Sequence, residues 1–370
     1  MKLIRDLIRI TLGATFIFSG FVKGIDPLGS TYKFTDYFSA FGTEWANGMA
    51  FGMAVILSII EFGMGLALVV NYRTKLFSLF TLIFMAFFLP LTLFIAIENP
   101  VSDCGCFGDA LIITNWETFY KNIVLSAMAV FVFIHRKKYN NKFNIVFQNL
   151  YFLFFLLLFM AIQNHSYHHL PIIDFRPYKV GNNIIELMEV PEDAPVDEYE
   201  TFFIYRNLNS GEEVEFDESN YPWQDTENWE YVDANSVLVK KGYHPPISNF
   251  FIENEYGENV SDYFLYDPGY TFIMVSHSLA KANYRNRFNK IANDALDAGM
   301  NFICLTASSP RDIEDFIEEY NPPYEFFFCD EITLKTIIRS NPGLVLLSEG
   351  TIIDKWHRND IPKFRNINFE

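Results

Sequence analysis

Residues 76–97 read LFSLFTLIFMAFFLPLTLFIAI, a stretch without a single charged side chain. A helix of about 20 apolar residues is long enough to cross the roughly 30 Å hydrocarbon core of a bilayer. Inside that layer each backbone N–H and C=O must find its partner within the segment, which favours an α-helix. Four further stretches of similar length are predominantly apolar and carry few charged side chains: 3–22, 48–70, 116–134 and 143–163.

The five stretches predict five membrane-spanning helices. Buried core helices of a large soluble protein are the alternative, but so little charge in five windows within residues 1–163 disfavours it. The first stretch resembles a secretory signal. It lacks an obvious small-residue cleavage site and is followed by further spans, so we expect it to remain as an uncleaved anchor.

The two parts of the chain differ sharply in charge. Residues 1–163 carry 12 Lys/Arg and 9 Asp/Glu, whereas residues 164–370 carry 16 Lys/Arg and 36 Asp/Glu, so nearly all of the net charge of −17 belongs to the second part. This asymmetry favours a bundle in the lipid bilayer followed by an acidic domain in water. An acidic surface repels nucleic acid and anionic headgroups, so we expect neither as a partner of the second part.

The short connections predict the orientation of the spans. Basic residues gather before the first span, between the second and third, and between the fourth and fifth: Lys2, Arg5, Arg9, Arg73, Lys75, Arg136, Lys137, Lys138 and Lys142. The positive-inside rule assigns these connections to the cytoplasm. We therefore expect a multi-pass protein of the cytoplasmic (inner) membrane with a cytoplasmic N-terminus. Residues 23–47, residues 98–115 and the C-terminal domain would lie on the periplasmic side.

All four cysteines, Cys104, Cys106, Cys304 and Cys329, fall on that outward side, where disulfides can persist. The first two stand in the loop 99–109, NPVSDCGCFGD. A disulfide across Cys-Gly-Cys closes a very small ring, and glycine is the residue best able to supply the backbone angles. Strained, exposed disulfides exchange readily. The pattern therefore favours redox chemistry, with Cys104 and Cys106 as the candidate catalytic residues.

Three other interpretations of this pair remain open: reduced structural thiols, half of a metal site, or packing residues that face lipid. A zinc site needs about four ligands, and the loop offers no further Cys or His. His165, His168 and His169 leave the fifth span on the same side. We favour redox chemistry over a metal site, for which we predict no ligand set.

Two ionisable residues lie within predicted spans, Arg9 in the first and Glu61 in the second. Such groups cost several kcal/mol in the bilayer unless they are paired. Both lie at a similar depth from the cytoplasmic ends of their spans, so we predict an intramembrane Arg9–Glu61 pair, more readily a structural clamp than a proton path. We expect Lys23 to extend to the outer interface.

Residues 9–27, RITLGATFIFSGFVKGIDP, resemble the opening helix of the DoxX family, and residues 61–68, EFGMGLAL, resemble its second helix. Residues 104–109, CGCFGD, are similar to the loop of the related MauE redox-associated membrane proteins. The resemblance covers residues 1–140 and implies a four-helix bundle with a role in disulfide or electron-transfer chemistry near the outer face. In MauE that role supports maturation of a disulfide-rich amine dehydrogenase, a client that nothing in this sequence identifies.

Four segments are expected: a DoxX/MauE-like membrane domain at 1–140, a fifth transmembrane helix at 141–165, a β-rich linker at 166–240 and an α/β domain at 241–370. In the last segment, strands are expected at 270–275, 301–306, 325–329, 344–347 and 351–356, and helices at 283–298, 310–319 and 333–340. Alternating strands and helices with a final hairpin predict a mixed sheet flanked by helices.

This last segment resembles the thioredoxin-like fold of the peroxiredoxin and TlpA type. Residues 340–350, SNPGLVLLSEG, match the region where that family has a cis-proline, and residues 242–248, GYHPPIS, resemble its entry segment. Where the family carries Cys-x-x-Cys, residues 276–283 read SHSLAKAN, without a thiol. We therefore expect a redox-inactive docking module. Cys304 and Cys329 fall in predicted strands and are expected to pack as small apolar groups.

The leading hypothesis is a membrane redox component in which Cys104 and Cys106 pass reducing equivalents between a membrane carrier and an extracytoplasmic client protein. No cofactor is evident. A quinone is implied only by analogy with related four-helix disulfide-forming enzymes. Whether the chain is itself a thiol–disulfide oxidoreductase stays open. The chief alternative is a non-enzymatic membrane scaffold or assembly protein, and a weaker one, suggested by Glu61 alone, is a small-molecule transporter.

Overall fold

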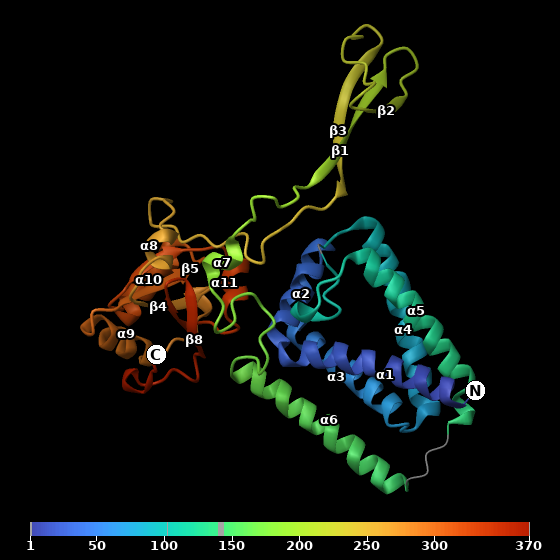
Figure 1. Cartoon of the computed structure of the whole chain (residues 1–370), viewed down its shortest axis with the longest axis horizontal. Helices are drawn as coiled ribbons and strands as arrows, with labels where there is room; N and C mark the ends of the chain where they lie inside the picture. The colour runs from blue at the N-terminus through green and yellow to red at the C-terminus, as the bar shows by residue number, and fades with distance from the viewer. Residues whose placement is uncertain (1, 102, 140–143, 370) are drawn as a thin grey trace. The chain divides into compact units, whose positions relative to one another are not determined.

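The computed structural model of the chain describes residues 2–101, 103–139 and 144–369 (Figure 1). Five of its helices are long and apolar enough to cross a membrane, so the five predicted spans are helical and suit a membrane bundle. They comprise α1, α3 with the short 3-10 turn before it, α4, α5 and α6: Lys2–Ile25, Glu44–Val69, Thr74–Glu98, Asn115–Ile134 and Ile145–His168. Three predicted features lie outside the described residues: Lys142, residue 143 at the start of the fifth predicted span, and the domain boundary at 140–141.

Helices α1 and α3 (Ala50–Val69) run side by side and make the most extensive helix–helix contact in the bundle (Figure 1). Glycines bring the two backbones together: a Cβ on Gly13 would lie 2.8 Å from the carbonyl oxygen of Gly65, and a Cβ on Gly20 would lie 2.5 Å from the backbone nitrogen of Phe62. In lipid the hydrophobic effect does not drive helices together, because lipid tails are as apolar as the side chains. Helix association there depends on close packing, which small residues allow.

The connection after α1 is itself helical, which the sequence analysis did not predict. Helix α2 (Pro27–Ala40) begins at Asp26, whose side chain accepts a hydrogen bond from Gly29 N, and Pro27 occupies the first helical position. In the connection between α4 and α5, Thr114 and Glu117 form a capping box that starts α5. These caps fix where α2 and α5 begin, and α5 begins directly after the cysteine loop.

The chain divides into two compact units, and residues 183–249 form the smaller one. A three-stranded antiparallel sheet has β1 (Glu198–Asn207) between β2 (Glu213–Asp217) and β3 (Trp229–Lys240). Aromatic rings hold it together: the Phe216 and Trp229 rings lie 5.1 Å apart. The same unit contains the short helix α7 (Ile184–Met188).

The C-terminal part of the larger unit is an α/β domain with a five-stranded sheet in the order β6-β5-β4-β7-β8. Strands β4, β5 and β6 are parallel, and β7 and β8 form an antiparallel hairpin. The strands are Tyr270–Ser276, Asn301–Thr306, Glu325–Phe328, Gly343–Ser348 and Thr351–His357. The helices are α8 Ser261–Leu265, α9 Arg287–Asp297, α10 Pro310–Tyr320 and α11 Glu331–Ile337.

Every strand and helix expected in this domain is present, and α8 is an addition. The central strands are apolar on both faces because helices cover both sides of the sheet: Phe272 and Met274 pack with α9 and α10 in one core cluster. Cys304 belongs to that cluster and is fully buried, and Cys329 follows β6 and is also buried. Both are free thiols, as expected of packing residues.

Candidate functional site

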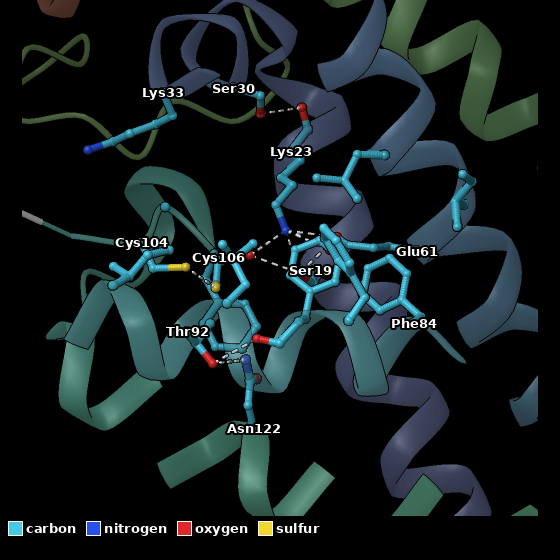
Figure 2. A pocket seen from close by; sticks show the side chains of 18 of the residues that line it. Ser19, Lys23, Ser30, Lys33, Glu61, Phe84, Thr92, Cys104, Cys106 and Asn122 are labelled. Carbon is cyan, nitrogen blue, oxygen red and sulfur yellow. Dashed lines mark hydrogen bonds and ion pairs between the residues drawn. The ribbon is translucent and has the colours of Figure 1, made fainter. Parts of the chain in front are cut away.

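Cys104 and Cys106 stand in the loop between α4 and α5 with their Sγ atoms 2.8 Å apart (Figure 2). A disulfide bond would be about 2.05 Å long, so the pair is two free thiols in close contact. Gly105 between them has φ +64°, in the left-handed region that glycine adopts without strain. The Cys-Gly-Cys spacing therefore turns both sulfurs to the same side of the loop.

The two thiols differ in acidity. The hydrogen bond from Cys104 lowers the pKa of Cys106 to about 6; burial opposes this shift, and the positive charges of Lys121 and Lys23 add to it. The same hydrogen bond, together with burial, raises the pKa of Cys104 well above its usual value. Cys106 is therefore the thiolate of the pair near neutral pH, and Cys104 is its hydrogen-bond donor.

Beneath the loop lies a buried ion pair between Lys23 of α1 and Glu61 of α3 (Figure 2). Lys23 Nζ donates to Glu61 Oε2 at 2.8 Å, to Ser19 Oγ at 2.7 Å and to the carbonyl oxygen of Cys106 at 2.6 Å. Ser19 Oγ is 2.8 Å from the same carbonyl oxygen. The Lys23 and Glu61 residues are only 8% and 5% exposed, so the pair is shut away from water.

This arrangement corrects the predicted Arg9–Glu61 pair. Arg9 lies level with the last turn of α3, where its guanidinium donates to the carbonyl oxygens of Leu68 and Val69 and approaches Asp6 at 3.7 Å. Eight residues, or about 12 Å of helix, separate that turn from Glu61. The terminal carbonyl groups of a helix lack hydrogen-bond partners within the helix and attract a cation, and Arg9 supplies that cation at the end of α3. Lys23, expected at the interface, turns inward to Glu61 instead.

Helices α2 and α5 hold the loop from its other sides. Tyr37 of α2 donates its hydroxyl to the carbonyl oxygen of Cys104 at 3.0 Å. Lys33 of the same helix pairs with Asp103 at 2.6 Å. The Nζ atom of Lys121, on α5, lies 4.2 Å from the centre of the Phe107 ring. The backbone around both thiols is therefore held by α1, α2 and α5 together.

The α/β domain contacts the loop through Arg339, which follows α11 and is 5% exposed. Its Nε donates to Asp26 Oδ2 at 2.9 Å, and its Nη2 donates to Asp109 Oδ2 at 2.9 Å. Asp109 ends the CGCFGD segment, and burial raises the pKa of its carboxyl group while Arg339 opposes that shift. The guanidinium also lies over the Tyr32 ring. One arginine thus joins α2, the cysteine loop and the C-terminal domain.

A cavity of about 460 Å³ adjoins the thiols (Figure 2). Its polar wall includes Lys23, Glu61, Asn122 and both cysteines, and the rest of its lining is mainly aliphatic and aromatic. Several of these apolar residues, on the spans α3 and α4, are also exposed on the outside of the bundle: Met53, Ile56, Ile60 and Phe87. These exposed apolar residues belong to helices that are long and apolar enough to cross a membrane.

The histidines weighed as metal ligands have other contacts. His169 Nδ1 lies 2.7 Å from Asp360 of the α/β domain, and the rings of His165 and His169 stack. Among the described residues no group of three or more His, Cys, Asp or Glu side chains is arranged to hold a metal ion.

Both thiols and Glu61 were predicted from the sequence as site residues, whereas the groups around them were not: Ser19, Lys33, Tyr37, Lys121 and Arg339. One signal was present. Ser19 and Lys23 are four residues apart and so share one face of α1, and that face also carries Gly20, which packs against α3. A serine and a lysine beside a close-packing glycine indicate a polar contact at that interface.

The N-terminal region is similar to a known family of membrane proteins. Residues 1–135 match the family model of methylamine utilisation protein MauE. The matched residues contain the first four spans, the thiol loop and the Lys23–Glu61 pair, so the MauE-like region holds the bundle part of the site. The match shows that residues 1–135 are similar to MauE, and the five apolar helices fit a membrane protein.

Outside the MauE-like region, residues 199–241 match a domain of unknown function (DUF8463). These residues are the three-stranded sheet of the smaller unit. Neither a curated protein nor a solved structure matches the chain.

Proposed function

We propose that this MauE-like chain is a membrane component of thiol–disulfide exchange with Cys104 and Cys106 as its reactive groups. The observation that carries the proposal is the contact of the two thiols at 2.8 Å, in which Cys106 is the more acidic. A thiolate beside a thiol is poised both to attack a disulfide and to close one.

Thiol–disulfide exchange with a client protein conserves electrons and protons without a further reagent. The Cys104–Cys106 disulfide accepts two electrons and two protons from a dithiol of an extracytoplasmic protein. The S–S bond of the loop breaks as the S–S bond of the client forms, through a mixed disulfide. In the reverse reaction the reduced Cys104–Cys106 dithiol reduces a disulfide of the client.

Return of the loop to its starting state needs a two-electron partner, and a membrane carrier of the quinone class fits the site. A quinone takes up two electrons and two protons as it becomes a quinol. The apolar cavity beside Cys106 supports this assignment, because exposed apolar residues of α3 and α4 line it and its wall also offers polar groups such as Lys23 and Asn122.

The compartment and the C-terminal domain belong to the same proposal. The basic connections support a cytoplasmic N-terminus in the inner membrane and a periplasmic thiol loop. The strand order of the α/β domain and the proline that precedes β7 support a thioredoxin-like fold. Because residues 276–283 contain no cysteine, that domain docks or selects the client and does not itself exchange thiols.

Thiol trapping in intact cells tests the proposal. Cells are treated with an alkylating mass tag before and after inhibition of the respiratory chain. We expect a Cys104–Cys106 disulfide in respiring cells and a shift to the tagged dithiol on inhibition, because a blocked carrier pool can no longer reoxidise the loop. Replacing Cys304 and Cys329 by alanine leaves only the loop thiols to be tagged, so that each mass step reports on this pair.

A non-enzymatic membrane scaffold is the second candidate. The buried state of Cys304 and Cys329 favours it, since burial raises the pKa of both thiols and removes them from exchange. The same trapping separates the two functions. A loop that stays reduced in every condition, together with full function of the Cys104→Ser/Cys106→Ser variant, supports the scaffold and contradicts the redox proposal.

A further inference from the structure

The geometry points to Lys23 as the positioning residue of the thiol pair: held by Glu61 and Ser19, it fixes the backbone of Cys106 and directs a positive charge to this thiol. The inference rests on the proposed thiol chemistry and assigns a purpose to an ion pair that the fold alone does not require.

The hydrogen bonds of Lys23 are complete and specific. Its ammonium group has three N–H donors, and Ser19, Glu61 and the carbonyl oxygen of Cys106 accept them. Only the last of these acceptors belongs to the loop. Any movement of Cys106 therefore breaks a charge-assisted hydrogen bond, and the carboxylate of Glu61 prevents the lysine from following.

The burial of this pair argues for a purpose beyond stability. Moving two charges out of water costs several kcal/mol per ion, and apolar residues of the same size stabilise a helix contact as well or better. Close packing of α1 and α3 is already supplied by Gly13, Gly20 and Gly65. An ion pair inside such a contact, bound to the backbone of a reactive cysteine, is typical of a functional group.

The charge on Lys23 acts on Cys106 together with several neighbours. Lys121 of α5 also favours the thiolate, and Glu61 of α3 disfavours it. The titratable and charged groups around the pair come from α1, α2, α3, α5 and the loop itself: Lys23, Lys33, Tyr37, Glu61, Lys121, Asp103 and Cys104. Lys23 and Glu61 push the acidity of Cys106 in opposite directions, which makes their roles separable.

The test measures the rate at which iodoacetamide alkylates Cys106 as a function of pH in the reduced full-length protein, with the modified residue located by mass spectrometry. Lys23→Met is expected to raise the pH of half-maximal rate by about one unit, since a neighbouring charge shifts a pKa by about that much or more. Glu61→Gln is expected to lower it, because Lys23 then acts unopposed. Lys23→Arg keeps the charge and is expected to stay near the wild-type value.

Opposite shifts in the Lys23→Met and Glu61→Gln variants identify an electrostatic and positioning role. If the Lys23–Glu61 pair only holds the helices together, both variants weaken it in the same way. Shifts of the pH of half-maximal rate in the same direction in both variants, or no shift in either, would overturn the inference. Lys75→Met, a change at an exposed lysine at the start of α4, is the matched control. If Lys23→Met does not fold, Glu61→Gln and Lys23→Arg still decide the matter. Alkylation needs no client or carrier, so this result stands apart from that of thiol trapping.

Discussion

At the scale of single residues, the site depends on which partner each charged or reactive group finds. Glu61 is bound by Lys23, Arg9 caps the end of α3, and the Sγ atoms of Cys104 and Cys106 are in hydrogen-bond contact. Each contact follows from a simple need: a buried charge must be paired, terminal carbonyls need donors, and a thiolate is stabilised by a donor.

The unequal acidity of the two loop thiols leads to a prediction about labelling. In the reduced protein at pH 7 we expect iodoacetamide to modify Cys106 before Cys104. The pKa of Cys106 is lowered to about 6 and that of Cys104 is raised well above its usual value, so the thiolate fraction favours Cys106. The lower nucleophilicity of an acidic thiolate offsets part of this advantage, and we expect a rate ratio of about tenfold. Peptide mass spectrometry over a time course measures both rates, and equal rates would contradict the assignment of Cys106 as the thiolate.

At the scale of elements, the contact between α1 and α3 places Lys23 against Glu61. The two helices approach closely because glycines replace side chains along the seam. A Cβ on Gly65 would lie 2.5 Å from both the carbonyl oxygen of Gly13 and the backbone nitrogen of Ile17. Since these neighbours are backbone atoms, they cannot move aside as a side chain would.

Gly65→Ala is therefore expected to force α1 and α3 apart and to lower the free energy of unfolding by about 1–3 kcal/mol, as overpacking of a tight contact does. Gly63→Ala is the matched control on the same helix, because the nearest atom to its added Cβ is a methyl group of Leu156 at 3.6 Å, an ordinary contact. Unfolding of both variants in detergent, followed by circular dichroism, gives the comparison. Equal stability would argue against close packing at this seam.

At the scale of the whole molecule, Arg339 connects distant parts of the sequence within the larger unit. It brings Asp26 at the start of α2 and Asp109 of the cysteine loop to one guanidinium at the end of α11. The two carboxylates share one guanidinium and would repel each other without it.

We expect Arg339→Met to free the cysteine loop from the α/β domain. Amide hydrogens of the loop should then exchange at least about tenfold faster, because a loss of ~1.4 kcal/mol of local stability already gives that factor. Hydrogen exchange of the full-length protein measures the effect. Arg311→Met, at an exposed arginine near the start of α10, is the control. Unchanged exchange in the loop would show that Arg339 does not hold it.

The elements of this protein were largely predictable because their signals are local. Five long apolar runs indicated five spans, and short apolar runs separated by helical segments indicated the five-stranded sheet. Helix α2 was missed because residues 27–40 are too polar for a span and too short to stand out. Its start signals, Asp26 as N-cap and Pro27 at the first turn, were nonetheless present.

By itself the sequence determined that this is a membrane protein with an acidic C-terminal part, and that two thiols one glycine apart lie between two spans. The tertiary structure alone decided the pairing: that Lys23 and not Arg9 meets Glu61, that Cys106 is the more acidic thiol, and that Arg339 reaches Asp109. Length and hydrophobicity act along the chain and can be read from it. A charge pairs with whichever opposite charge the packing of helices brings near, and that depends on seams such as the one between Gly13 and Gly65.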